Sequence, residues 1–311
     1  MKAIVYNKKA PDKLIYCDVD KPAPNDNEVL IKVRATSINA ADYRSLRMGI
    51  IPKRKIFGAD ISGTIESVGK NIKDFNVGDE VIGDLSNSGF GGLAEFALAP
   101  EKALIHKPKN ISFEDSAALP LAAITALQAL RNKGNIKSGQ KVLIVGSAGG
   151  VGTFAVQIAK YFGAEVTAVC SSKSVEQSKS LGADFVVDYT KEDFAKSKGG
   201  FDLIVAINGN RSLRSYKQML NPNGKYVMVG GSLNQIFRSL VFGRFMSFGS
   251  KKMVSLTAKS NQNDLELIVK LVVEGKVKPV IDRRYTLDKA IEAMKYLNEG
   301  HARGKVIISL D

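Results

Sequence analysis

The fold is decided by the stretch Lys141-Val142-Leu143-Ile144-Val145-Gly146-Ser147-Ala148-Gly149-Gly150-Val151-Gly152. Its first five residues form a short apolar run that suits a strand buried in a parallel sheet. The glycines permit a tight turn, and a helical pattern follows from Val151 to Phe162. Such a turn presents backbone N–H groups at a helix N-terminus, where they bind phosphate. The stretch therefore predicts a dinucleotide site in which the pyrophosphate is lined by Gly149, Gly150, Val151 and Gly152.

Further apolar runs continue this theme toward the C-terminus. They are 165–170, 185–187, 202–206 and 225–229, with helical patterns such as 174–181 between them and a candidate sixth strand at 253–258. Strands that alternate with helices are typical of a parallel sheet covered by helices. A glycine turn alone is also compatible with an ordinary strand-to-helix turn, and the glycine spacing here departs slightly from the strict pattern because Ser147 occupies the first position. The repeated strand–helix units favour nucleotide binding.

The end of the second strand of this region indicates which cofactor binds. A site for NAD usually has Asp or Glu there, about 20 residues past the glycines, to bind the ribose hydroxyls. This chain has Cys170-Ser171-Ser172-Lys173, which supplies hydroxyls and a cation but no carboxylate. We therefore predict NADPH, with its 2′-phosphate bound by Ser171, Ser172 and Lys173. The alternative for Lys173 is a solvated lysine at the start of a helix.

Length and composition limit the class of protein. The chain has 311 residues, of which 44% are hydrophobic and 24% charged, so we expect about two folded domains. This composition excludes a largely disordered, a collagen-like and a disulfide-stapled protein. Residues 1–105 contain short apolar runs broken by Pro, Gly and Asp, as in a small barrel-like β domain. The two cysteines and two histidines do not suffice for a four-thiolate zinc site. No apolar run reaches the roughly 20 residues that span a bilayer, so we expect a soluble, cytoplasmic protein.

The charge balance favours anionic partners. The chain has 45 Lys and Arg against 31 Asp and Glu, a formal net charge of +14. Residues 203–263 contain no Asp or Glu, and the segment 233–246 mixes aromatic residues with arginines. This segment is compatible with contact to an anionic membrane, with a dimer edge or with a substrate lid. Binding of nucleic acid is not expected, because no recognition motif or aromatic platform accompanies the charge.

The whole chain resembles the zinc-independent quinone oxidoreductase branch of the medium-chain dehydrogenase/reductase superfamily. The resemblance is carried by residues 28–33, 36–42, 58–63 and 75–81, and then by the glycine turn, Leu181-Gly182-Ala183-Asp184 and Gly230-Gly231. It implies an α/β protein with a GroES-like β-rich catalytic domain at 1–114 and 261–311 and a Rossmann NADP-binding domain, a doubly wound parallel sheet, at 115–260. It also implies a homodimer.

The resemblance further implies which chemistry is absent. Zinc-dependent relatives bind the metal through Cys, His and Cys, and the matching positions here are Asn39, Ala59 and Leu121. We therefore expect no metal, and a substrate that delocalises the charge left by hydride addition, namely a quinone or an α,β-unsaturated carbonyl compound. Asn39 is the expected catalytic residue, with Tyr43 second. The alternatives are a helix-capping or turn role for Asn39 and a packing role for Tyr43.

Further cofactor contacts follow only from the resemblance. Tyr189 would join the 2′-phosphate site, Asn208 and Gly209 would pass the adenine ribose, and Thr125 would lie beside the nicotinamide. The nicotinamide side would also include Val229, Gly230 and Gly231. Arg303 would reach the cofactor phosphates, or else lie solvated in a loop.

The expected function is an NADPH-dependent reductase of quinones or enones. The main alternative is a non-catalytic, nucleotide-responsive protein that binds RNA or an anionic membrane through its basic face. A zinc alcohol dehydrogenase is a third reading, and the three replaced ligand positions argue against it.

Overall fold

The computed structural model describes residues 1–196, 199–209, 211–231, 247 and 249–310. The chain divides into two compact units. The first comprises Met1–Ile124, Lys259–Gly275 and Pro279–Asp311, and the second comprises Thr125–Ala258 and Lys276–Lys278. The first unit extends past the boundary expected at residue 114, because the helix α2 (Phe113–Ala117) packs on strands of that unit. The basic segment 233–246 lies outside the described residues.

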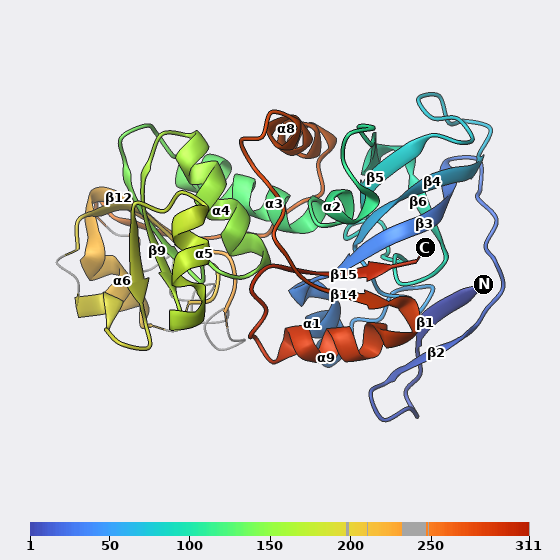
Figure 1. The fold of residues 1–311 in the computed structure, drawn as a ribbon, viewed down its shortest axis with the longest axis horizontal. Helices are drawn as coiled ribbons and strands as arrows, with labels where there is room; N and C mark the ends of the chain where they lie inside the picture. The colour runs from blue at the N-terminus through green and yellow to red at the C-terminus, as the bar shows by residue number, and fades with distance from the viewer. Residues whose placement is uncertain (197–198, 210, 232–246, 248, 311) are drawn as a thin grey trace. The chain divides into compact units, whose positions relative to one another are not determined.

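The second unit contains the parallel sheet expected from the sequence (Figure 1). Its strands lie in the order β10-β9-β8-β11-β12-β13, and every neighbouring pair is parallel. Counted along this unit, the order is 3-2-1-4-5-6, the doubly wound arrangement of a Rossmann domain. The strands are β8 (Lys141–Val145), β9 (Glu165–Cys170), β10 (Phe185–Asp188), β11 (Phe201–Ala206), β12 (Leu220–Met228) and β13 (Lys252–Ser255).

Helices of the second unit cover this sheet. Helix α4 (Gly150–Tyr161) is buried over eight consecutive residues, Gly152–Ala159, and contacts β8 and β9. Tyr216 and Tyr226 stack with ring centroids 4.8 Å apart in the core. The other helical segments are the π-helix η2 (Gln128–Gly134), the 3₁₀ turns η3 (Ser172–Ser174) and η4 (Phe194–Lys196), α5 (Val175–Ser180) and α6 (Leu213–Met219).

The first unit is built around one long strand, β3 (Glu28–Ile38), which pairs antiparallel with three others. Its partners are β4 (Asp60–Val68), β6 (Phe96–Pro100) and β15 (Lys305–Ser309). The sheet is completed by β5 (Glu80–Asp84), β7 (Leu104–His106) and β14 (Ile281–Thr286), and a separate hairpin is formed by β1 (Lys2–Tyr6) and β2 (Leu14–Asp18). This unit is the GroES-like, β-rich domain expected from the sequence.

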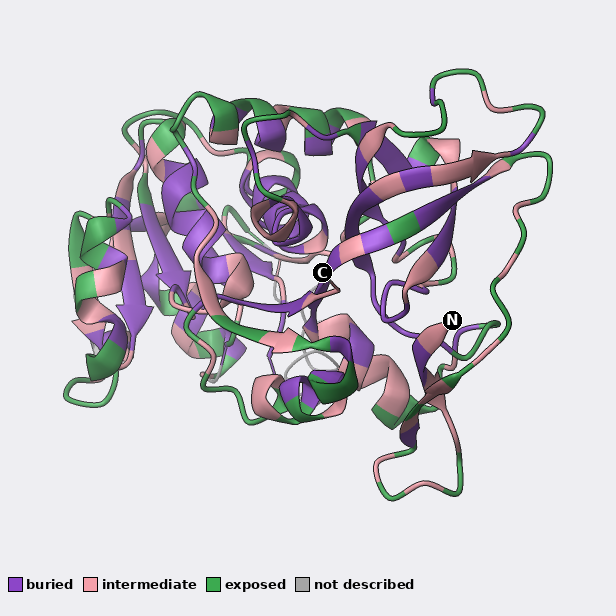
Figure 2. Cartoon of the chain, turned by 45° about the vertical axis from the view of Figure 1, so that its right-hand side comes forward, coloured by how far each residue is buried: buried purple, intermediate pink, exposed green. Residues whose placement is uncertain are grey.

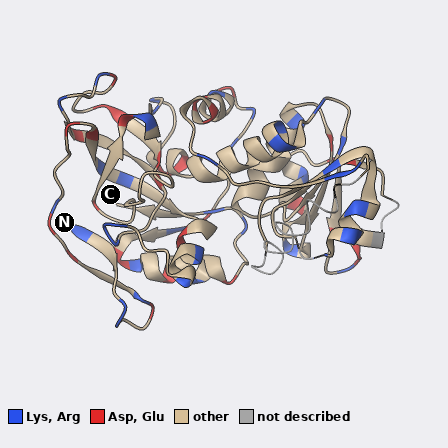
Figure 3. Ribbon diagram, turned by 180° about the vertical axis from the view of Figure 1, so that it is seen from behind, with Lys and Arg blue, Asp and Glu red and all other residues tan. Residues whose placement is uncertain are grey.

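The central strands of both sheets are mostly buried, whereas the edge strands β10 and β14 are mostly intermediate or exposed (Figure 2). The helical segments of the first unit lie against its sheet or at its ends. They are α1 (Ala40–Met48), α2, α8 (Gln262–Val273), α9 (Ala290–Asn298) and the 3₁₀ turns η1 (Glu101–Ala103) and η5 (Leu287–Lys289). Helix α3 (Pro120–Leu127) begins in the first unit and ends in the second. Lys and Arg are interspersed with Asp and Glu over much of the described chain (Figure 3), whereas the described residues between 203 and 263 include Lys and Arg but no Asp or Glu. No helix among the described residues is long and apolar enough to cross a bilayer.

Candidate functional site

The glycine turn connects β8 to α4 and leaves open space in front of the helix. Gly149 is the residue before α4, in an extended conformation. A Cβ atom added at Gly149 would meet nothing within 4 Å, whereas one added at Gly152 would lie 2.1 Å from the carbonyl oxygen of Gly146. Gly152 is therefore needed for close packing of α4 on the turn, and Gly149 leaves room for a ligand. The first N–H groups of an α-helix have no partner within the helix, so they can bind an anion there.

The turns after β8, β11 and β12 lie together at the carboxyl end of the sheet. A Cβ added at Gly146, whose φ is +86°, would lie 3.0 Å from the nitrogen of Asn208. Asn208 in turn donates from its backbone to the oxygen of Val145, and Gly209 pairs with Gly231 in a parallel bridge. Because β8 and β11 flank the point where the strand order reverses, this is the place where doubly wound sheets bind ligands. Thus the structure brings together most of the cofactor residues expected from the sequence, including Val229 and Gly230, which both bond Ala206.

The candidate 2′-phosphate residues gather at the ends of β9 and β10. The two strands pair Cys170 with Asp188, and the backbone of Tyr189 donates to the oxygen of Cys170 at 3.0 Å. The side chains of Lys173 and Tyr189 are exposed, with Tyr189 half exposed at 50%. Ser171 precedes the turn η3 that contains Ser172 and Lys173. These expected residues therefore lie on neighbouring strand ends.

A carboxylate that the sequence analysis missed lies in this group. The hydroxyl of Ser172 donates to Oδ2 of Asp188 at 2.5 Å, and both the backbone and the hydroxyl of Thr190 bond Oδ1. The bond from Ser172, followed by that from Thr190, holds the pKa of Asp188 below its ordinary value. The single O–H of Ser172 is thus used within the protein, and the exposed cation of Lys173 is better suited to meet a phosphate. Asp188 directly precedes Tyr189 in the sequence, so its place beside the expected residue Tyr189 could have drawn attention to it.

Two further expected cofactor residues, Thr125 and Arg303, are distant in the sequence from the residues at the ends of β9 and β10. Thr125 is buried on α3, and Arg303 is exposed in the loop before β15, where its backbone donates to Asp282 at 3.1 Å. Their assignment to the cofactor continues to rest on the resemblance.

A buried polar cluster in the first unit contains Asn39. Register explains how it forms: β3 pairs Ile38 with Val306 and Ser37 with Asp60, so the end of β3 meets the starts of β15 and β4. The ammonium of Lys305 donates to Oδ1 of Asn39 at 2.6 Å and to Oδ2 of Asp60 at 3.3 Å. The side-chain amide of Asn39 donates to the same Asp60 oxygen at 2.8 Å.

Asp60 is the acceptor that organises this cluster. Besides Asn39 and Lys305, it accepts from the hydroxyl of Ser37 at 2.5 Å and from the backbone of Leu121 at 2.8 Å. Asp60 is 0% exposed, Lys305 2% and Asn39 8%, so Asn39 is the most exposed of the three. Lys305 was not identified from the sequence, where it stands in an ordinary Gly-Lys at a strand start.

Two further buried carboxyls belong to this region. Asp42 accepts from the backbones of Asn39 and Gly58 at 2.7 and 2.9 Å, which holds the N-terminus of α1 in place. Burial raises the pKa of Asp42 to about 7, despite those bonds. Burial, and then the charge of Asp60, raises the pKa of Asp84 to about 6. Asn39 occupies the N-cap position of α1, which is the helix-capping role that the sequence left open as an alternative. Its side chain also forms hydrogen bonds with Lys305 and Asp60.

The three positions matched to zinc ligands meet around Asp60. Asn39 and Leu121 both donate to its carboxylate, and Ala59, fully buried, precedes it in the chain. An amide, a methyl and an isobutyl side chain offer no thiolate or imidazole for zinc. Over the described part of the chain, no group of three or more His, Cys, Asp or Glu residues has the arrangement of a metal site.

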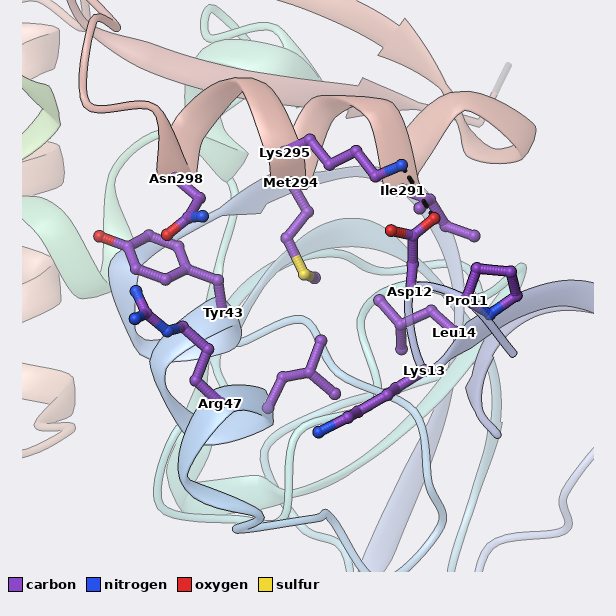
Figure 4. Close-up of a pocket in the computed structure, with 11 residues that line it drawn as sticks. Pro11, Asp12, Lys13, Leu14, Tyr43, Arg47, Ile291, Met294, Lys295 and Asn298 are labelled. Carbon is purple, nitrogen blue, oxygen red and sulfur yellow. Dashed lines mark ion pairs between the residues drawn. The ribbon is translucent and has the colours of Figure 1, made fainter. Parts of the chain in front are cut away.

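Tyr43 lines a separate pocket on the same unit (Figure 4). The pocket has a volume of about 260 Å³ and lies between α1, α9 and the turn of the β1–β2 hairpin. Tyr43 lies near Arg47 and Asn298 there, and Lys295 forms an ion pair of 2.9 Å with Asp12. Of the two residues expected to be catalytic, Asn39 therefore belongs to the buried polar cluster, whereas Tyr43 lines this pocket.

Comparison with known proteins supports the fold assigned to each of the two units. Residues 25–109 match the family described as alcohol dehydrogenase GroES-like domain, and residues 181–308 match the family described as zinc-binding dehydrogenase. The chain is 38% identical to the chloroplast envelope quinone oxidoreductase homolog of Arabidopsis thaliana, over 99% of this chain and 98% of that protein. It is 32% identical to an NADPH-dependent alkenal/one oxidoreductase of the same plant, over 99% of this chain and 79% of that protein.

A solved structure gives the same result. The quinone oxidoreductase from Coxiella burnetii superposes with a TM-score of 0.88 at 31% identity, over 100% of this chain and 99% of that one. The resemblance stated from the sequence is confirmed: the chain belongs to the quinone oxidoreductase branch of the medium-chain dehydrogenase/reductase superfamily.

Proposed function

We propose that this protein is an NADPH-dependent reductase that transfers hydride to quinones or α,β-unsaturated carbonyl compounds without zinc. The observation that carries the proposal is the glycine turn at the reversal point of the parallel sheet, with open space in front of α4. The relatives in Arabidopsis thaliana are named a quinone oxidoreductase homolog and an NADPH-dependent alkenal/one oxidoreductase, which supports the same substrate classes.

The second unit would hold the cofactor. Backbone N–H groups at the start of α4 would bind the pyrophosphate, since the helix N-terminus carries a partial positive charge. The exposed side chains of Lys173 and Tyr189 would contact the 2′-phosphate, and this contact is the basis for preferring NADPH to NADH. When bound, NADPH supplies the hydride.

The first unit would hold the acceptor oxygen. Of the two amide hydrogens of Asn39, one is bonded to Asp60 at 2.8 Å, and the other has only a long 3.3 Å contact with the carbonyl of Ser37. A bond of that length is weak, so a substrate oxygen can compete for this hydrogen. A quinone or enone needs no Lewis acid, because the charge left by hydride addition is delocalised and a proton from solvent completes the reduction.

The test is steady-state oxidation of NADPH by the purified full chain with 9,10-phenanthrenequinone and, separately, with 2-alkenals. NADH is assayed in parallel, and each assay is repeated after treatment with a metal chelator. Turnover that is higher with NADPH and insensitive to the chelator is the expected result. Tight NADPH binding without turnover of either acceptor would overturn the reductase proposal, and failure to bind either cofactor would overturn the cofactor site as well.

The phosphate contact has its own matched control. Lys173→Glu is expected to raise the KM for NADPH at least about tenfold and to leave NADH unchanged, because a charge near the 2′-phosphate is reversed. Lys179→Glu makes the same change on the exposed face of α5, where Lys179 pairs with Glu176 of the same helix at 2.9 Å. Equal effects of the two variants would refute the assignment of Lys173.

Contact of the basic segment 233–246 with an anionic membrane and formation of a homodimer remain predictions from the sequence. Co-sedimentation with vesicles and size-exclusion chromatography with light scattering would test them.

A further inference from the structure

A lysine and a carboxylate are buried together where the proposed substrate site meets the sheet of the first unit. Lys305 begins β15, Asp60 begins β4, and Asn39 follows the last residue of β3. The side chains of Lys305 and Asp60 are at most 2% exposed. A buried ion pair is not an efficient way to stabilise a fold, because apolar residues of similar volume are often as good or better. Its presence therefore calls for a role besides stability.

The contacts determine which way the Asn39 amide faces. A lysine ammonium only donates hydrogen bonds, so the atom of Asn39 that lies 2.6 Å from it must be the amide oxygen. A carboxylate only accepts, so the amide nitrogen must face Asp60. Lys305 and Asp60 together thus hold one orientation of the amide, with its second hydrogen toward the long contact with Ser37.

The same contacts strengthen the amide as a donor. A cation that donates to the oxygen of an amide draws electron density from its nitrogen, and hydrogen bonds in such a chain polarise one another. Because Asn39 is more exposed than Lys305 and Asp60, polarisation by the buried Lys305 would be felt by a group that approaches Asn39.

We infer that Lys305 is a positioning residue of the proposed reductase: it orients and polarises the Asn39 amide, which then donates to the acceptor oxygen as negative charge develops there. This inference rests on the proposed function. Lys305 itself does not contact the substrate. Asp60 balances its charge and holds the amide nitrogen.

The experiment compares two buried lysines of the same unit. Lys305→Met removes the ammonium and keeps most of the side-chain volume. Lys107→Met is the matched control, since Lys107 is 8% exposed, pairs with Glu80 at 2.9 Å and donates to the carbonyl of Ile111 at 2.7 Å. A third variant, Asp60→Asn with Lys305→Met, removes both charges, so that a soluble protein is obtained even if the single change unfolds it. Lys305→Arg keeps the charge.

For each variant, kcat with 9,10-phenanthrenequinone, the KM for NADPH and the thermal midpoint are measured. We expect kcat to fall about 10²-fold in Lys305→Met and in the double variant, as when a stabilising donor is lost, with the KM for NADPH unchanged within about twofold. Lys305→Arg should recover part of kcat. Lys107→Met should lower the thermal midpoint and leave kcat near that of the wild type. A folded double variant with wild-type kcat would overturn the inference.

A second readout does not depend on turnover. In protein labelled with ¹⁵N-asparagine, the side-chain amide signal of Asn39 is assigned by its loss in Asn39→Ala. Both the double variant and Lys305→Met should shift this signal, and Lys107→Met should not. If the wild type reduces no acceptor, the proposed function fails, while a shift in Lys305→Met would still establish that Lys305 acts on Asn39. An unchanged signal would reject the positioning role in either case.

Discussion

The ammonium nitrogen of Lys305 lies 2.6 Å from the amide oxygen of Asn39, although 266 positions separate the two residues in the chain. Antiparallel pairing of β3 with β15 brings them together, and Asp60 on β4 accepts a hydrogen bond from each. The cluster combines a buried ion pair with an amide that is 8% exposed. Substitutions in this cluster can therefore show separately how it affects the stability of the fold and how it affects kcat.

Stability should depend on keeping the charges of this cluster balanced. Lys305→Met leaves the Asp60 carboxylate buried without its cation, and we expect the free energy of unfolding to fall by about 3 kcal/mol. The loss stays at the low end for buried pairs because Ser37 and Leu121 still donate to Asp60. Adding Asp60→Asn should recover most of it. Urea denaturation of both variants measures this, and a double variant less stable than Lys305→Met would contradict the prediction.

The two glycines of the turn should respond differently to alanine. Gly152→Ala brings a Cβ to 2.1 Å from the Gly146 oxygen, so we expect the thermal midpoint to fall by several degrees. Gly149→Ala meets no protein atom within 4 Å and has an ordinary backbone conformation, so the midpoint should not change. The methyl group would, however, project into the space proposed for the pyrophosphate, and the Kd for NADPH should rise at least about tenfold. Calorimetry and fluorescence titration test the pair, and unchanged NADPH affinity in Gly149→Ala would argue against a phosphate at this position.

Asp188 should limit the preference for NADPH. Its carboxylate accepts from Ser172 beside the proposed 2′-phosphate site, so Asp188→Asn removes a repelling charge and is expected to lower the KM for NADPH by about three- to tenfold without changing that for NADH. Asp184→Asn is the control, because Asp184 precedes the opposite end of β10, where it pairs with Lys160 at 2.7 Å. A gain in Asp184→Asn equal to that in Asp188→Asn would show a general charge effect instead.

The buried carboxyls should make stability fall as pH rises. Asp84 and Asp42 have pKa values raised to about 6 and about 7, so between about pH 4 and those values the folded state binds more protons than the unfolded state. The free energy of unfolding should therefore decrease across this window, by at most about 1.4 kcal/mol per pH unit for each group. Asp84→Asn should flatten the decrease below about pH 6. Urea denaturation across this range provides the measurement, and an equal slope in the variant would contradict the role of Asp84.

Local sequence determined much of this molecule. The apolar runs and the glycines predicted a β-rich region, a parallel strand–helix region and the turn before α4, because strand period, turn geometry and helix starts depend on residues close together in the chain. The resemblance implied that the two regions are a GroES-like unit and a Rossmann unit. The segment 233–246 was noticed for its composition, and its structural role stays a prediction.

The tertiary structure alone decided which side chains meet. Lys305 could not be paired with Asn39 and Asp60 from the sequence, because their contact depends on the register of three strands that are distant in the chain. The bond between Ser172 and Asp188 depends likewise on the pairing of β9 with β10, and the packing of α1 against α9 forms the pocket that Tyr43 lines. Periodicity identifies the elements, whereas long-range pairing selects the partners of each polar group when it is buried away from water.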